Sequence, residues 1–190
     1  MQHPSEKRAD PTVSPRFVHA VHDQLLRYDG MRAGSERPCP GCAATSLRKN
    51  GYQAAGKTFA RLVTDDGFEV VTLEVQLYEC KQCGRSFQGD LTEFFYAGCA
   101  YARPIVDLCL FHVVDHSYQS VERILGQWYG LQVDRDTIER YDQRHGPTST
   151  PREHVSVDGS ELSVPFLAFL FGENRAESQQ FAVSSHTALW

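Results

Sequence analysis

Four cysteines in two closely spaced pairs are the residues of this chain best suited to chemistry. The pairs are Cys39 with Cys42 and Cys80 with Cys83, and 37 residues separate the inner cysteines. Two residues between cysteines let both thiolates bind one ion, and two such pairs supply four soft ligands in a tetrahedron. The spacing therefore predicts a structural Zn²⁺ site formed by all four cysteines.

The same cysteines could instead form two disulfides, or a redox-active pair, in an oxidising compartment. Residues 1–29 are polar, carry three prolines and contain no apolar stretch that resembles a signal peptide. We therefore expect a reducing cytoplasm, in which zinc is the better prediction. Cys99 and Cys109 each stand alone among apolar residues, which indicates buried thiols and not ligands.

The chain between the two pairs has the pattern of a β-ribbon. Asp66-Gly67 is a hairpin turn signal. The residues after it alternate between apolar and polar, which predicts a half-buried strand that runs into Cys80. The apolar members of this alternation are Val71, Leu73, Val75 and Leu77. We predict that residues 38–93 form a zinc ribbon.

Charge limits the classes of partner. The chain has 190 residues, a net charge of −5 and no run of 18 apolar residues, so we expect no membrane partner. An acidic protein does not coat nucleic acid by bulk electrostatics. Residues 1–60 carry nine Lys and Arg against five Asp and Glu, whereas residues 61–190 carry ten against nineteen. Any DNA contact should therefore depend on the N-terminal segment and on individually placed arginines.

Residues 94–146 predict three helices, of which the last two are joined by a tight turn. An apolar run that follows Pro104 indicates a buried helix. Ser117 is suited to cap the next helix and Gly130 to end it, and Asp134 is suited to cap the last. This arrangement is typical of a helix-turn-helix, whose final helix can enter the major groove of DNA.

The candidate DNA-binding residues lie on the last two of these helices. They are Arg123, Arg135, Thr137, Arg140 and Arg144. Arginine can pair with guanine through two hydrogen bonds or can hold phosphates. Acidic residues interleave with the arginines of the last helix and weaken this interpretation. A plain helical hairpin that packs against the ribbon therefore stays open as the alternative.

The two ends of the chain carry weaker patterns. Residues 1–37 predict a polar tail, a short amphipathic helix and then a loop from Gly30 to Pro38. Residues 152–190 contain a short β-rich run at 154–159 and two apolar runs at 166–171 and 181–183, which predict strands separated by turns. The predicted fold class is a multi-module α+β protein.

The order of these parts resembles insertion-sequence transposases with an Asp-Asp-Glu catalytic domain. The resemblance covers about residues 38–190. It rests on the two cysteine pairs, on the Gly84-Arg85-Ser86-Phe87 that follows them, on the helix pair from Tyr118 to Tyr141, and on the stretch from Val155 to Glu161. The resemblance implies that this last stretch is the first strand of a ribonuclease-H-like domain, which would occupy residues 152–190 in part.

In that family the ribbon and the helices recognise terminal repeats in double-stranded DNA, and three carboxylates hold divalent metals for phosphoryl transfer. The resemblance makes Asp158 the first carboxylate. No Asp follows it in the sequence, so we expect a catalytically incomplete chain, with Mg²⁺ required only if a complete catalytic domain exists. The alternative interpretation of Asp158 is a turn residue before Gly159.

The sequence thus predicts a zinc-dependent, sequence-specific DNA-binding protein of transposase type. We expect it in the cytoplasm, associated with the nucleoid, with double-stranded DNA and a second copy of itself as candidate partners. Two alternatives stay open. One is a repressor or transposition inhibitor that occupies the same repeats, and the other is a zinc-ribbon module that docks on proteins, which the acidic balance favours.

Overall fold

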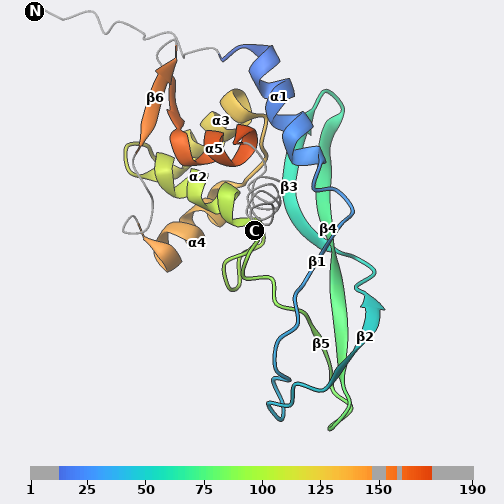
Figure 1. The fold of residues 1–190 in the computed structure, drawn as a ribbon. Helices are drawn as coiled ribbons and strands as arrows, with labels where there is room; N and C mark the ends of the chain where they lie inside the picture. The colour runs from blue at the N-terminus through green and yellow to red at the C-terminus, as the bar shows by residue number, and fades with distance from the viewer. Residues whose placement is uncertain (1–12, 147–152, 158–159, 173–190) are drawn as a thin grey trace, which may run out of the picture.

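The computed structural model describes residues 13–146, 153–157 and 160–172 (Figure 1). In these residues the chain is mixed α+β, which confirms the α+β part of the predicted class. The helices are α1 Pro15–Leu26, α2 Arg103–Val113, α3 Tyr118–Tyr129, α4 Arg135–His145 and α5 Val164–Phe171. The strands are β1 Met31–Ala33, β2 Leu47–Tyr52, β3 Lys57–Thr64, β4 Gly67–Cys80, β5 Ser86–Gln88, β6 His154–Val157 and β7 Ser160–Ser163. None of these helices is long and apolar enough to cross a bilayer.

Strand β4 is the element around which the other strands are arranged. Its first part pairs with β3 in antiparallel fashion and, further along, with β1 in parallel. Its last part pairs with β2 and β5, both antiparallel. In Figure 1, β4 runs from the helical body down to a narrow tip, where β2 and β5 flank it. The strand ends at Cys80, as the alternating pattern predicted.

The inward-facing side of β4 changes along its length, so the prediction for Leu77 was wrong. The predicted alternation holds for Val71, Leu73 and Val75, which are all buried. Beyond them Gln76 and Tyr78 are buried, whereas Leu77 is only half-buried. The change coincides with an irregularity in the pairing of β2 with β4, whose register shifts between Lys49 and Tyr52.

Two further predictions about the ribbon need correction. The hairpin turn lies one residue earlier than predicted, at Asp65 and Asp66, because Gly67 pairs with Thr64 as the first residue of β4. The predicted loop from Gly30 to Pro38 contains β1, which sequence periodicity cannot reveal in three residues. Its pairing with β4 depends on tertiary contact.

The C-terminal region also differs from its prediction. The stretch from Val155 to Glu161 is not one strand, because β6 ends at Val157 and β7 begins at Ser160, with Glu161 opposite Ser156. The apolar run 166–171 is helix α5 and not a strand. Ser163 caps this helix by accepting from the N–H of Phe166, and a proline stands in its first turn. The predicted run at 181–183 lies outside the described residues.

The described residues form two separate hydrophobic cores. The larger one combines β3 and the first part of β4 with all five helices, so the predicted segments 38–93 and 94–146 share it. The smaller one lies in the tip and is formed by Cys39, Tyr78, Cys80 and Phe87. The cysteine tip therefore has its own packing, while the rest of the ribbon is part of the helical body.

The turn between α3 and α4 is fastened to strand β3. Gly130 ends α3 in the left-handed conformation, with φ 65°, as predicted. The N–H of Val63 donates to the Gly130 carbonyl over 2.8 Å, and the N–H of Gln132 donates to the Arg61 carbonyl over 2.9 Å. These bonds extend the sheet by one short bridge and fix the direction in which α4 leaves the turn.

Candidate metal centre and nucleic-acid interface

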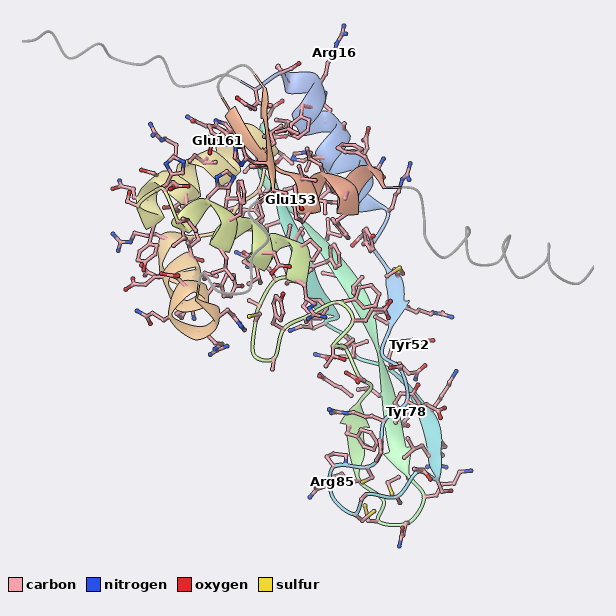
Figure 2. The ribbon with its side chains drawn as sticks, turned by 60° about the vertical axis from the view of Figure 1, so that its left-hand side comes forward. Arg16, Tyr52, Tyr78, Arg85, Glu153 and Glu161 are labelled. Atoms are coloured by element: carbon pink, nitrogen blue, oxygen red, sulfur yellow. The ribbon has the colours of Figure 1, made fainter. Side chains whose placement is uncertain are left out.

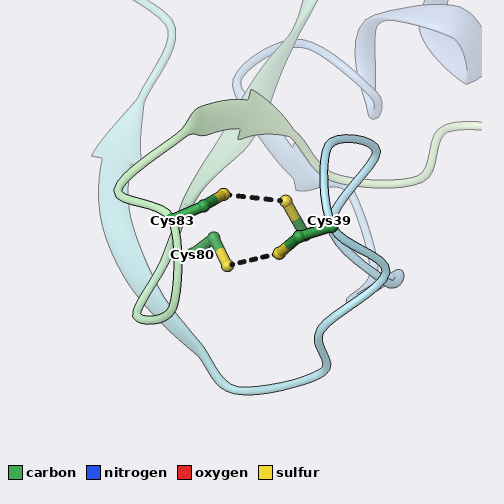
Figure 3. Close-up of side chains that lie close together, drawn as sticks. Cys39, Cys80 and Cys83 are labelled. Carbon is green, nitrogen blue, oxygen red and sulfur yellow. Dashed lines mark hydrogen bonds between the residues drawn. The ribbon is translucent and has the colours of Figure 1, made fainter.

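The four predicted cysteine ligands come together at the tip. The sulfur atoms of Cys39, Cys42, Cys80 and Cys83 all lie within 4.8 Å of one another. Sγ of Cys39 is 3.6 Å from Sγ of Cys83, and Sγ of Cys42 is 3.6 Å from Sγ of Cys80 (Figure 3). All four are free thiols, so the structure holds no disulfide among them.

The backbone builds both cysteine pairs in the same way. The N–H of Ala43 donates to the Cys39 carbonyl over 2.8 Å, and the N–H of Gly84 donates to the Cys80 carbonyl over 2.9 Å. Ala43 and Gly84 both have positive φ, of 59° and 71°. The N–H of each first cysteine donates to the carbonyl oxygen five residues further on, at 2.9 Å in both. The two turns are therefore copies of one structure that face each other across the sulfurs.

The sulfur geometry fits a tetrahedral ion. Four sulfurs at about 2.3 Å from a zinc ion would be separated by about 3.8 Å, close to the 3.6 Å of the two facing pairs. Disulfide sulfurs are only about 2.05 Å apart. The cluster could thus hold a metal ion such as zinc.

Backbone N–H groups prepare the sulfurs for a cation. Burial opposes ionisation of Cys39, but hydrogen bonds from the backbone of Gly41 and Cys42 outweigh it and lower the pKa of Cys39 to about 6. Despite a hydrogen bond with the backbone of Ala44, burial and the neighbouring sulfurs raise the pKa of Cys42 to about 12. The Cys42 thiol thus resists ionisation, and a bound cation would displace its proton.

Basic side chains surround the cysteine tip, a feature that the sequence indicated only as an N-terminal excess of positive charge. Five of them are exposed: Arg37, Arg48, Lys49, Lys81 and Arg85. The Arg85 guanidinium lies against Gly41, where an added Cβ would be 3.0 Å from it. Figure 2 shows Arg85 beside the cysteines and Arg16 at the opposite end of the molecule. Among the described residues, Arg48 is the one basic side chain of the tip with a short ion pair, to Glu79 at 2.8 Å.

Helix α4 presents its predicted arginines on the surface. Asp134 caps the helix as predicted, accepting from the N–H of Thr137 over 2.9 Å. Arg135, Arg140 and Arg144 are exposed, while Ile138 and Tyr141 face the core. The arginines share the outer face with acidic residues, and Arg135 pairs with Asp136 at 3.2 Å.

The other predicted DNA-binding residues differ in exposure and in position. Thr137 is buried, and its hydroxyl donates to Asp134 over 2.7 Å and accepts from the Arg140 guanidinium over 2.7 Å. Thr137 therefore orients the Arg140 guanidinium from the buried side of α4. Arg144 donates to the Gly98 carbonyl over 2.8 Å. Arg123 is exposed on α3, a different helix.

Asp158, the predicted catalytic carboxylate, lies outside the described residues. Cys99 and Cys109 are buried, as predicted, and burial raises the pKa of both thiols. Cys99 lies 3.2 Å from Nε2 of His145 at the end of α4. Neither thiol belongs to the four-cysteine cluster.

Comparison of the chain with models of protein families, with curated proteins and with solved structures finds no match in any of the three.

Proposed function

We propose that the chain is a zinc-dependent, sequence-specific DNA-binding protein of the transposase type. Zinc would be held by Cys39, Cys42, Cys80 and Cys83, where it would cross-link the two turns of the tip. The basic tip and helix α4 would contact the same double-stranded DNA. The proposal concerns binding alone, because no Asp follows Asp158 in the sequence to complete the carboxylate set that strand transfer requires.

The observation that carries the proposal is the joint between α4 and the ribbon. A helix that reads bases must be held at a fixed angle, since base contacts require fixed hydrogen-bond geometry. The turn before α4 is hydrogen-bonded to β3, and β3 pairs along its length with β4, whose far end carries Cys80. Helix α4, through the turn before it, and the basic tip are thus both attached to the sheet that β3 and β4 form.

The charges on α4 support selective rather than bulk binding. Asp136 and Glu139 lie beside Arg135 and Arg140 and would repel phosphates on any DNA. Thr137 holds Arg140 through a 2.7 Å hydrogen bond. The Arg140 side chain therefore loses less conformational entropy when it binds DNA. An aligned arginine is suited to the bidentate contact with guanine.

Selection from a random pool of duplex DNA tests this proposal. Zinc-loaded full-length protein should enrich a defined sequence over successive rounds, and Cys80→Ser should not. Arg16→Ala serves as the matched control, because Arg16 is exposed on α1 and distant from the tip (Figure 2). Enrichment of no sequence by the zinc-loaded wild-type protein would remove the proposal and favour protein docking by the tip.

A further inference from the structure

A cavity of about 460 Å³ lies on the helical body, away from the four cysteines. Its size is within the range of small-molecule sites, roughly 300–1,000 Å³. It is bordered by α2, by α5 and by the segment that leads from the tip to α2. Six of its lining side chains are aromatic: Tyr28, Phe59, Phe94, Tyr96, Phe166 and Phe169.

The aromatic wall is held by stacking. Tyr28 stacks on Phe59 with ring centroids 4.5 Å apart and planes 9° from parallel. Phe169 of α5 stacks on Tyr28 at 5.6 Å. Stacking of this kind orients the rings, and the face of an aromatic ring carries partial negative charge that attracts cations.

A carboxylate from α2 reaches into this apolar surrounding. Asp107 lines the cavity and is half-buried. Its Oδ1 accepts from the hydroxyl of Tyr96 over 2.8 Å, and this is the only hydrogen bond of its carboxyl group among the described residues. Burial raises the pKa of Asp107, although the hydrogen bond from Tyr96 and the nearby charges of Arg103 and His145 partly oppose the rise. The other carboxylate oxygen of Asp107, Oδ2, is therefore available to accept a hydrogen bond from a ligand.

The charges around the cavity favour a cation. Glu93 adds a second, exposed carboxylate to the lining. The cation among the lining residues is Arg103, which is already engaged. Its guanidinium lies 4.4 Å from the centroid of the Tyr96 ring, and Nη1 donates to the Thr92 carbonyl over 2.8 Å. The cavity lining thus has two carboxylates and one guanidinium, and that guanidinium already bonds to the segment before α2.

We infer that this cavity binds an organic amine whose protonated nitrogen pairs with Asp107 and whose planar ring packs among the aromatic side chains. The ammonium donates to Oδ2 of Asp107 and adds a direct charge partner to the nearby charges of Arg103 and His145. The ring replaces water against Phe166 and Phe169. An anion of the same shape is disfavoured by Asp107 and Glu93. This site is independent of the proposed DNA-binding function.

Calorimetric titration of full-length, zinc-loaded protein with 2-phenylethylamine at pH 7.5 tests the inference. The matched probe is 2-phenylethanol, which has the same ring and carries no charge. We expect saturable binding of the amine that is at least about tenfold tighter than that of the alcohol. Asp107→Asn should remove this preference, whereas Glu153→Gln, an exposed carboxylate on another segment, should retain it.

Equal affinity for the amine and the alcohol would overturn the inference, and so would the absence of saturable binding of the amine. Retention of the preference in Asp107→Asn would overturn the role of that carboxylate. If Asp107→Asn does not fold, thermal unfolding of the wild-type protein with each probe still decides. The amine must raise the melting temperature more than the alcohol does at the same concentration.

Discussion

The backbone N–H of Val63 donates to the carbonyl oxygen of Gly130 over 2.8 Å, which joins the hairpin end of β3 to the turn before α4. The same oxygen accepts from Nε2 of His22 over 2.9 Å. One glycine thus connects β3, α1 and the end of α3. The proposed DNA-reading helix is oriented by this joint rather than by its own sequence.

Substitution of this glycine should loosen the joint. In Gly130→Ala the added Cβ would lie 2.3 Å from Nε2 of His22 and 2.5 Å from Cγ1 of Val18, at a φ of +65°. Left-handed backbone alone costs about 1–2 kcal/mol, and overpacking adds about 1–3 kcal/mol. Gly51→Ala is the matched control, because Gly51 has φ +74° and open space around it. Urea unfolding should show the larger loss for Gly130→Ala, and equal losses would contradict the proposed steric role.

One zinc ion per chain should bind at the tip. Cys80→Ser should abolish stoichiometric zinc in elemental analysis, whereas Cys109→Ala, which removes a buried thiol of the helical body, should retain it. Structural zinc in small modules contributes on the order of 10 kcal/mol, so a chelator should unfold the tip while the larger core persists. Zinc-free native protein, or a disulfide between Cys39 and Cys42, would refute this prediction.

His112 should make the protein less stable in mild acid. Burial lowers the pKa of His112 to about 3, and its Nε2 shares a 3.1 Å hydrogen bond with the hydroxyl of Tyr129. The unfolded chain takes up this proton near pH 6.5 and the folded chain does not. Stability is therefore full above that pH and is lost as the pH falls toward 3, by up to about 1.4 kcal/mol per pH unit from this group. Urea unfolding of His112→Phe should show a shallower dependence between pH 6.5 and 4.5, and an unchanged slope would contradict the assignment.

The arginines of α4 should carry sequence preference. In a duplex obtained by selection, Arg140→Ala should cost about 1–3 kcal/mol and relax preference at one position, if it contacts a base. Arg135→Ala combined with Arg140→Ala should cost more, while Arg16→Ala should cost nothing. Fluorescence anisotropy with the selected duplex and a shuffled one measures both effects. Unchanged binding by the double variant would exclude α4 as the reading helix.

Local signals made helices α3 and α4 predictable. Ser117 and Asp134 cap α3 and α4, and Gly130 ends α3, because each function depends on a side chain or backbone freedom within one turn. Cysteine spacing likewise predicted the cluster, since each pair is built by a local turn. The two pairs meet because β4 carries Cys80 and Cys83 back to Cys39 and Cys42.

Features that depend on distant contacts could not be predicted. The three residues of β1 are a strand only because β4 lies beside them. The apolar run of α5 has no periodicity that separates a helix from a buried strand, although Ser163 and Pro165 were an available helix-start signal. The basic tip is assembled from residues that are far apart in sequence, such as Arg37 and Arg85, so charge along the chain did not reveal it.

We expect DNA binding to require bound zinc, and the salt dependence of DNA binding measured with and without a chelator tests this link. Anisotropy titrations of the selected duplex with zinc-loaded protein should weaken steeply between about 50 and 200 mM salt, as binding through several phosphates requires. After chelation, specific binding should be lost. An affinity for DNA that is insensitive to salt, or that is unchanged after removal of the metal, would exclude zinc-dependent DNA binding by the tip and α4.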